Sequence, residues 1–181
     1  MHTDGPHPLV RYVLDLDRAA LAKLRRSLAF PLGTWPGAFP FVEPFVAAAP
    51  RAQRRHAYLV AGLIAWARAD GPGSGDLGEA CARLRDSLVS DAAVERRFLA
   101  LLDADEEGLP HHLRQLVALF AQHRVAPDWS RLLADLKHWS HPDRWVQQRW
   151  AKSFYARMAR VEPDEHPTPA QEGFDAVNAA T

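Results

Sequence analysis

Apolar residues recur at helical spacing along most of the chain, and this pattern restricts the fold more than any other feature of the sequence. After Pro50, Val60, Leu63, Ile64 and Ala67 occupy the i, i+3, i+4 and i+7 positions that share one face of an α-helix. No run of four to eight residues alternates apolar and polar side chains in the way a half-buried strand does. The sequence therefore predicts an all-α fold.

Helix caps and breakers divide this pattern into about seven helices, which we expect to pack ridge into groove. The expected ranges are 15–28, 51–70, 77–88, 92–105, 111–124, 128–140 and 142–160. Asp15 or Asp17 can cap the first helix, and Asp91 and Asp128 can cap two of the later ones, because a carboxylate accepts hydrogen bonds from free backbone N–H groups.

The segments between the predicted helices carry their own expectations. Residues 1–13 are expected to be loosely structured, and the proline-rich segment 30–50 is expected to contain no long element. The aromatic residues of 30–50 could stack on bases, but packing against the helices is the favoured interpretation. The glycine-rich stretch 71–78 is interpreted as a flexible linker and as the possible boundary between two small bundles within one domain, residues 1–160.

The formal net charge of zero conceals an uneven distribution of charge. The chain has 22 basic and 22 acidic residues, but five of the acids and none of the basic residues lie in 161–181. The remainder therefore carries a formal charge of +5. We expect 161–181 to be a disordered acidic tail, because it is polar and interrupted by prolines. Only three of the basic residues are lysine, and arginine suits phosphate recognition because its planar fork donates two hydrogen bonds.

The last predicted helix combines an apolar face with a basic one. Pro142 suits a first helical turn, and Asp143 suits the positive end of a helix. Val146, Trp150 and Phe154 fall on one face, whereas the neighbouring face is basic. That neighbouring face contains Arg149, Lys152 and Arg160. Two interpretations remain open: the basic residues pair with acids elsewhere in the chain, or they bind an external anion.

The arrangement of reactive side chains does not favour an enzyme, a metal site or a bound cofactor. His111 and His112 are adjacent, so they would point about 100° apart on a helix. The chain has no H-E-x-x-H motif and no cysteine pair. Cys81, the single cysteine, occupies an apolar helix position and is expected to be a buried structural thiol. One cysteine and the lack of an apolar run of about 18 residues predict a cytoplasmic protein that does not span a membrane.

The stretch 95–155 resembles the CasB family, the small subunit of the type I-E CRISPR surveillance complex called Cascade. The similarity lies in four motifs: RRFLALLDAD, LPHHLRQLV, the DW-x-x-LL-x-DL run at 128–136, and W-x-x-x-x-W-A-x-x-F-Y at 145–155. The segment DRAALAKLRRSL also matches, so the resemblance extends over about 15–160. At Gln147 and Gln148 we expect more basic side chains in relatives, so this helix carries less charge than the family implies.

This resemblance implies a non-catalytic, all-α protein that acts in antiviral defence and is present in two copies within the complex. The implied partners are a guide RNA, a backbone-forming subunit, a large PAM-reading subunit, and the target and displaced DNA strands of the R-loop. Contacts to nucleic-acid backbone would stabilise the R-loop, because its formation is a near-balanced exchange of one duplex for another. The alternative is a purely structural scaffold that bridges protein subunits.

Carried over by position, the resemblance assigns nucleic-acid binding to basic residues on several helices. Three lie in the LRR helix near the N-terminus, two open the long helix after Pro50, and the others lie within the matched motifs. The predicted set is Lys23, Arg25, Arg26, Arg54, Arg55, Arg96, Arg97, Arg114, Arg144, Arg149 and Lys152. Trp139, Trp145, Trp150 and Phe154 are assigned to the core.

Overall fold

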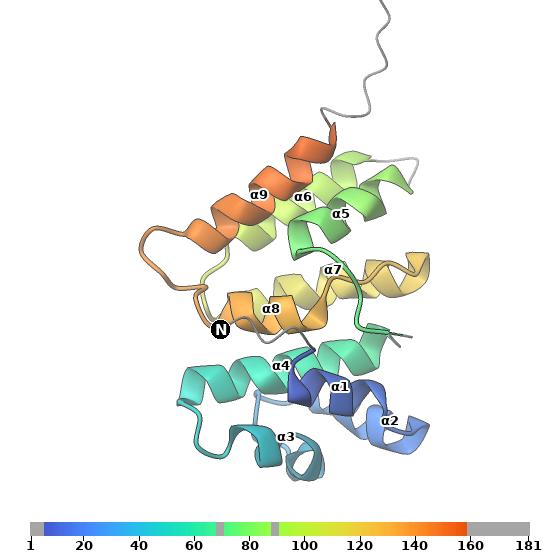
Figure 1. The fold of residues 1–181 in the computed structure, drawn as a ribbon, viewed down its shortest axis with the longest axis vertical. Helices are drawn as coiled ribbons and strands as arrows, with labels where there is room; N and C mark the ends of the chain where they lie inside the picture. Colours follow the sequence, from blue (N-terminus) through green and yellow to red (C-terminus); the bar gives the residue numbers. More distant parts are fainter. Residues whose placement is uncertain (1–5, 68–70, 88–90, 159–181) are drawn as a thin grey trace, which may run out of the picture.

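The computed structural model describes residues 6–67, 71–87 and 91–158. Within these ranges the fold consists of helices and connecting loops, with nine α-helices and one 3₁₀ helix (Figure 1). The helices are α1 (Pro8–Leu14), α2 (Arg18–Ser27), η1 (Pro36–Ala38), α3 (Phe39–Val46), α4 (Arg51–Ala67), α5 (Leu77–Asp86), α6 (Asp91–Asp103), α7 (Leu109–His123), α8 (Trp129–Leu136) and α9 (Trp145–Met158). The all-α prediction is confirmed, with more helices than the expected seven. The predicted acidic tail, 161–181, lies outside the described residues.

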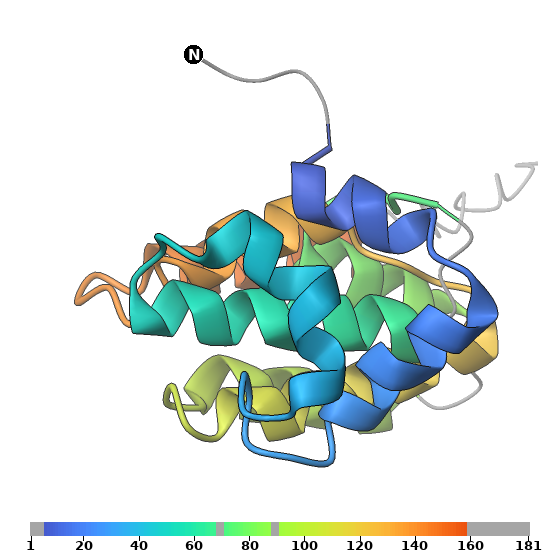
Figure 2. The same cartoon turned by 90° about the horizontal axis from the view of Figure 1, so that it is seen from below.

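The long helix α4 organises one end of the molecule. Helices α1, α2 and α3 pack on it from one side, and α7 and α8 lie on its other side (Figures 1 and 2). At the opposite end α5 packs against α9 and α6. Buried apolar side chains from all nine α-helices form one continuous cluster, in which Phe98 stacks on Phe154 at 4.5 Å and Trp139 lies 5.3 Å from Trp150 between ring centroids.

The expectation that residues 1–13 are loosely structured is wrong for α1. Pro8 begins this helix, and the side chain of His7 accepts a hydrogen bond from Leu9 N–H at 3.3 Å. Leu9, Val10 and Val13 are buried, and the helix packs on α4. A helix of seven residues is unstable by itself, so this one depends on tertiary packing that the local sequence does not reveal.

The segment 30–50 has the predicted broken character. It contains only η1 and the eight-residue α3, which holds Pro44 inside it. Its aromatic side chains pack on the helices: Phe45 lies 5.1 Å from Tyr12, and Phe39 lies 6.3 Å from Tyr58, between ring centroids. The prediction of packing is therefore confirmed for these two residues.

The predicted start of the last helix at Pro142 is wrong by three residues, since α9 begins at Trp145. Pro142 and Asp143 instead form a turn, in which Arg144 N–H donates to the His141 carbonyl at 2.9 Å. Arg144 has a φ of 49°, which a continuing right-handed helix does not allow. Its carbonyl accepts from Gln148 N–H at 3.0 Å, so Arg144 ends the turn and its carbonyl accepts the first hydrogen bond of α9.

The glycine-rich loop after residue 70 is attached to the segment before α8. Pro72 and Gly75 accept backbone hydrogen bonds from Trp129 and Asp128, at 3.1 and 2.9 Å. Arg83 Nη2 also donates to the carbonyls of Ser74 and Ala126, both at 2.8 Å. These contacts hold the described part of the loop against the chain. The proposed sub-bundle boundary at 71–78 stays a prediction.

The described residues contain no helix that is both long enough and apolar enough to cross a lipid bilayer.

Candidate nucleic-acid interface

Helix α2 presents three predicted cations to solvent. The Asp17 carboxylate accepts from Ala20 N–H at 2.8 Å and so fixes the start of the helix, as the sequence predicts. Leu24 and Leu28 are then buried toward α4, which turns Lys23, Arg25 and Arg26 outward. Together with Ala22, Trp35 and Trp66 these cations line a hollow of about 860 Å³.

The three α2 cations pair with no carboxylate in the described part of the chain. Lys23 Nζ instead lies 5.9 Å from the ring centroid of Phe41, and the Arg26 guanidinium lies 5.9 Å from that of Trp35. Contacts of this kind orient a cation without neutralising it. The positive charge of this face is therefore available to an external anion.

The first turns of α4 divide their arginines between an internal partner and solvent. Arg54 forms an ion pair with Glu43, which also accepts from the Tyr58 hydroxyl at 2.7 Å. The hydrogen bond from Tyr58 lowers the pKa of Glu43, and Arg54 lowers it further. The pKa of Tyr58 is raised, first by burial and then by its hydrogen bond to Glu43. Arg51 and Arg55 line a hollow of about 640 Å³ with no carboxylate within ion-pair distance among the described residues, although Glu107 also lines it. Arg54 thus has an acidic partner within the chain.

Three further candidate arginines donate to backbone carbonyls of the protein itself. Arg114 reaches the carbonyl of Leu28 at 2.6 Å and that of Pro110 at 3.1 Å, and so links α7 to the end of α2. Arg97 Nη1 donates to Ala93 within α6 at 3.0 Å, and Arg144 donates to the carbonyl of Leu102. Each guanidinium thus already stabilises a helix end or a helix contact.

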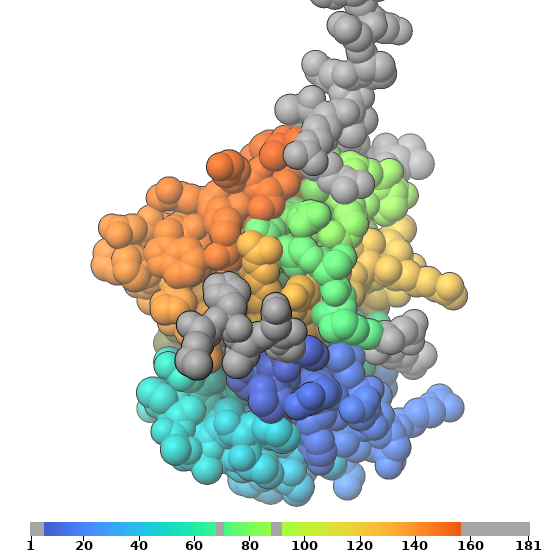
Figure 3. Space-filling view, viewed as in Figure 1, coloured from blue at the N-terminus to red at the C-terminus, as the bar shows by residue number. Residues whose placement is uncertain are grey.

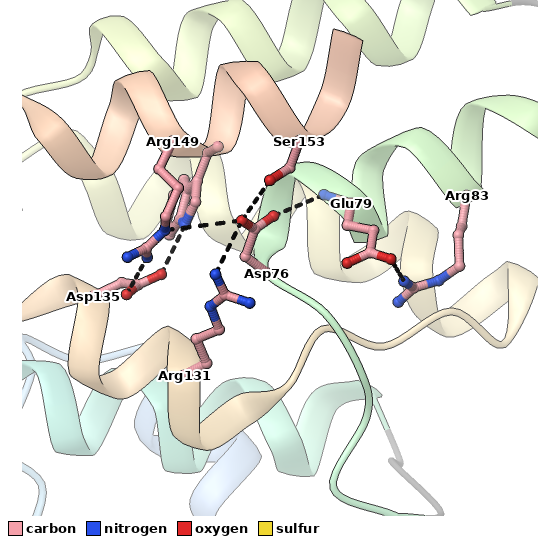
Figure 4. A network of polar contacts seen from close by, with 8 residues as sticks. Asp76, Glu79, Arg83, Arg131, Asp135, Arg149 and Ser153 are labelled. Carbon is pink, nitrogen blue, oxygen red and sulfur yellow. Dashed lines mark hydrogen bonds and ion pairs between the residues drawn. The ribbon is translucent and has the colours of Figure 1, made fainter. Parts of the chain in front are cut away.

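Arg149 lies against two buried carboxylates (Figure 4). It forms an ion pair with Asp135, and its Nε lies 3.9 Å from Asp76 Oδ2. Asp135 also accepts from Trp150 Nε1 at 2.8 Å, and Asp76 accepts from Ser153 Oγ at 2.7 Å. The pairing interpretation of the basic face of α9 therefore holds for this residue.

Asp76 and Asp135 were not singled out from the sequence, yet they determine how this part of the fold is held together. Asp76 also caps α5 by accepting from Glu79 N–H at 2.9 Å and lies 3.6 Å from an Arg131 nitrogen. An N-cap position was the only signal for Asp76. Asp135 is the second aspartate of the DW-x-x-LL-x-DL run, but its partners lie on another helix, so this motif did not reveal them.

The remaining candidates on α6 and α9 are exposed. Arg96 and Lys152 have no carboxylate partner within the described ranges. Gln147, where more positive charge was expected in relatives, is buried and donates to the Trp139 carbonyl at 2.8 Å. Because this position faces the core side of α9, a charged side chain there would lose its solvation, and the uncharged Gln147 avoids that cost. Trp139, Trp150 and Phe154 are buried as predicted, and Trp145 is partly buried.

The candidate residues do not form one patch. Those of α2 and the start of α4 lie at one end of the molecule, and those of α6 and α9 lie at the other, with α7 and α8 between (Figures 1 and 3). The three cations of α2 are exposed, have no acidic partner among the described residues, and share a hollow whose described lining includes no carboxylate, whereas Glu107 lines the hollow of Arg51 and Arg55. Sequence reasoning missed Trp66 in that hollow, although its position off the apolar stripe of α4 indicated exposure.

Known proteins resemble the chain in both sequence and fold. Residues 20–155 match the family described as CRISPR-associated protein Cse2. A CRISPR-associated protein Cse2 from Thermus thermophilus is 46% identical over 147 residues, which cover 80% of this chain and 83% of the relative.

Solved structures agree with this match. The crystal structure of M. ruber CasB aligns with a TM-score of 0.71 at 36% identity, covering 84% of this chain and 93% of that one. A chain of a structure named CRISPR RNA-guided surveillance complex aligns with a TM-score of 0.72 at 28% identity, covering 84% and 92%. The chain belongs to the Cse2 family of CRISPR-associated proteins, also called CasB.

Proposed function

We propose that this chain is a non-catalytic subunit of an RNA-guided CRISPR surveillance complex, in which it holds nucleic-acid backbone and so stabilises the R-loop. Membership of the Cse2 family supports the assignment to such a complex, as does the likeness to a chain of a solved surveillance complex. Its proposed partners are the guide RNA, the backbone-forming subunit, the large PAM-reading subunit, a second copy of itself, and the target and displaced DNA strands.

The cationic face of α2 is the observation that carries the nucleic-acid part of this proposal. Lys23, Arg25 and Arg26 are exposed on one hollow, and no described carboxylate neutralises them. Side chains of this kind contact phosphates and read no base sequence. Sequence-independent contacts suit an R-loop, because the guide RNA supplies the specificity and the displaced strand can have any sequence.

The scaffold alternative also has an observation in its favour. Arg54 and Arg149 pair with carboxylates of this chain, and Arg97, Arg114 and Arg144 donate to its carbonyls. These candidates act inside the subunit, so the number of cations available to nucleic acid is smaller than the sequence implied. In a subunit that only bridges proteins, the unpaired cations of α2 would pair with acidic residues of neighbouring subunits.

Reconstitution of the guide-RNA complex with and without this chain tests the proposal. We expect omission to weaken target-duplex affinity and to expose the displaced strand in a footprint. The informative variant is Arg25→Glu/Arg26→Glu, and its matched control is Arg11→Glu/Lys137→Glu, which reverses two exposed charges elsewhere. The first should lose DNA affinity while the complex assembles normally. Failed assembly with the first variant alone would support the scaffold instead, and unchanged DNA affinity would refute the role of α2.

A further inference from the structure

The hollow beside α2 contains an exposed tryptophan that has no aromatic partner among the described residues. Trp66 lies in the last turn of α4 and keeps 38% of its surface exposed, whereas Trp129 and Trp150 are fully buried. No described residue forms a ring stack with Trp66 or accepts a hydrogen bond from its Nε1. An indole that is exposed in this way offers a flat apolar face to a ligand.

The close crossing of α2 and α4 determines what surrounds this ring. At Gly62 a Cβ atom would lie 2.5 Å from Leu28 Cδ2 and 3.3 Å from the Leu24 carbonyl, so the two helices approach closely there. One turn further along α4, Trp66 consequently lies beside the polar face of α2. It lines the same hollow as Lys23, Arg25 and Arg26.

Trp66 also lines a second hollow. It has a volume of about 670 Å³, and Phe120 and Arg124 of the α7 end are among its other lining residues. Arg124 is exposed there and has no acidic partner within the described ranges. Neither hollow has a carboxylate among its described lining residues. Trp66 thus lies between cations on α2 and a cation at the end of α7.

Trp35, the other tryptophan of the first hollow, differs in its surroundings. It stacks on Phe30 with a centroid distance of 5.8 Å and an interplanar angle of 9°, and a Cβ at Gly37 would lie 2.3 Å from its ring. The Trp35 ring therefore has Phe30, Gly37 and the Arg26 guanidinium as neighbours within the chain. Trp66 is the tryptophan of this hollow whose ring remains available.

The geometry points to Trp66 as a stacking platform for an unpaired base of single-stranded nucleic acid, with the flanking phosphates held by Arg25 and Arg26 on one side and Arg124 on the other. This inference rests on the proposed function and deepens it from backbone contact to recognition of a single strand. Base stacking on an aromatic ring accepts any base, so it adds affinity without sequence preference. A paired duplex keeps its bases stacked inside and cannot use this ring.

The test compares two oligonucleotides of equal length and charge, with the full chain as the protein. One is a 20-nucleotide thymidine strand, and the other replaces its nucleosides by abasic residues. We expect the base-bearing strand to bind at least about fivefold more tightly, because stacking of one base is worth ~1 kcal/mol or more. Trp66→Leu should remove this preference, while Trp66→Phe should retain most of it because a phenyl ring still offers a stacking face.

A matched aromatic control separates Trp66 from other exposed rings. Tyr155 on α9 is also 38% exposed, and Tyr155→Leu should leave the preference for base-bearing DNA unchanged. Quenching of tryptophan fluorescence gives a second measure: the strand should quench the wild-type chain more than Trp66→Leu. Far-UV circular dichroism of each variant checks that the fold is retained.

The outcomes also separate this inference from the proposed function. Equal affinity of wild type for both strands, with a normal salt dependence, would overturn stacking and leave the backbone contacts intact. No binding of either strand would refute both. If Trp66→Leu binds both strands as wild type does but fails to assemble into the guide-RNA complex, the ring contacts a protein neighbour and the inference is wrong.

Discussion

The guanidinium of Arg149 on α9 pairs with the buried carboxylate of Asp135 on α8, while the Arg149 side chain keeps 31% of its surface exposed. The same guanidinium lies 3.9 Å from Asp76, which caps α5. One side chain thus connects three helices (Figure 4). Its removal would leave the buried Asp135 without a counter-charge, whereas Asp76 would keep Arg131 at 3.6 Å.

Replacing Arg149 should therefore cost stability and not only nucleic-acid affinity. We expect Arg149→Met to lower the free energy of unfolding by about 3 kcal/mol, because an uncompensated buried charge is expensive. Lys152→Met, three residues further along the same helix and exposed, should change it by less than ~0.5 kcal/mol. Urea denaturation of both variants provides the measurement. Equal stability of the two would contradict the role assigned to the Asp76–Asp135–Arg149 cluster.

The stability of the protein should decline in mildly acidic solution through His56. Burial lowers the pKa of His56 below 6.5, although Glu106 partly opposes the shift. The imidazole of His56 therefore binds a proton more readily in the unfolded state than in the folded state. The contribution of neutral His56 to the free energy of unfolding is complete above pH ~6.5 and is lost as pH falls through the folded-state pKa. Between pH 5 and 7.5 the free energy of unfolding should change less steeply with pH for His56→Gln than for wild type. A slope that is unchanged in this variant would assign the effect to other groups.

The loop before α5 should tolerate a methyl group at one glycine and not at another. Gly73 has a φ of +74°, and a Cβ there would lie 1.8 Å from the Pro127 carbonyl oxygen, whereas nothing lies within 4 Å of a Cβ at Gly71. We expect Gly73→Ala to destabilise the protein by more than ~1 kcal/mol and Gly71→Ala to have little effect. Thermal unfolding of the two variants distinguishes them. Similar melting temperatures would mean that the contact of this loop with 126–129 is not maintained in solution.

The salt dependence of single-strand binding should identify which arginines contact phosphate. With about 4–6 phosphates engaged, the log–log slope should be about −3 to −4. Arg25→Gln should reduce its magnitude by about 0.7, since one phosphate contact is lost. Arg54→Gln should leave the slope nearly unchanged, because Glu43 already pairs with Arg54. Fluorescence anisotropy titrations at several salt concentrations measure both slopes, and a larger effect from Arg54 would reverse this assignment.

Local patterns in the sequence were sufficient to predict most of the helices. The carboxylates of Asp17 and Asp128 cap the helices they were expected to cap, because capping involves only the next three residues. Leu113, Leu116, Val117 and Phe120 are buried on one face of α7, as their spacing predicts. Neighbours along the chain determine such features, so they can be derived without knowledge of the fold.

The tertiary structure alone decided which cations remain available to a ligand. Arg25 and Arg149 looked alike in the sequence, but Arg149 meets Asp76 and Asp135 from two other helices, whereas Arg25 meets no described carboxylate. Helix α1 likewise forms because it packs on α4, and Trp66 is exposed beside cations because α2 crosses α4 at Gly62. The sequence by itself determined the helical class and the identity of the charged residues. The charges were paired or left free by contacts between residues far apart in the chain, because the energy of an ion pair depends on distance and burial and not on sequence order.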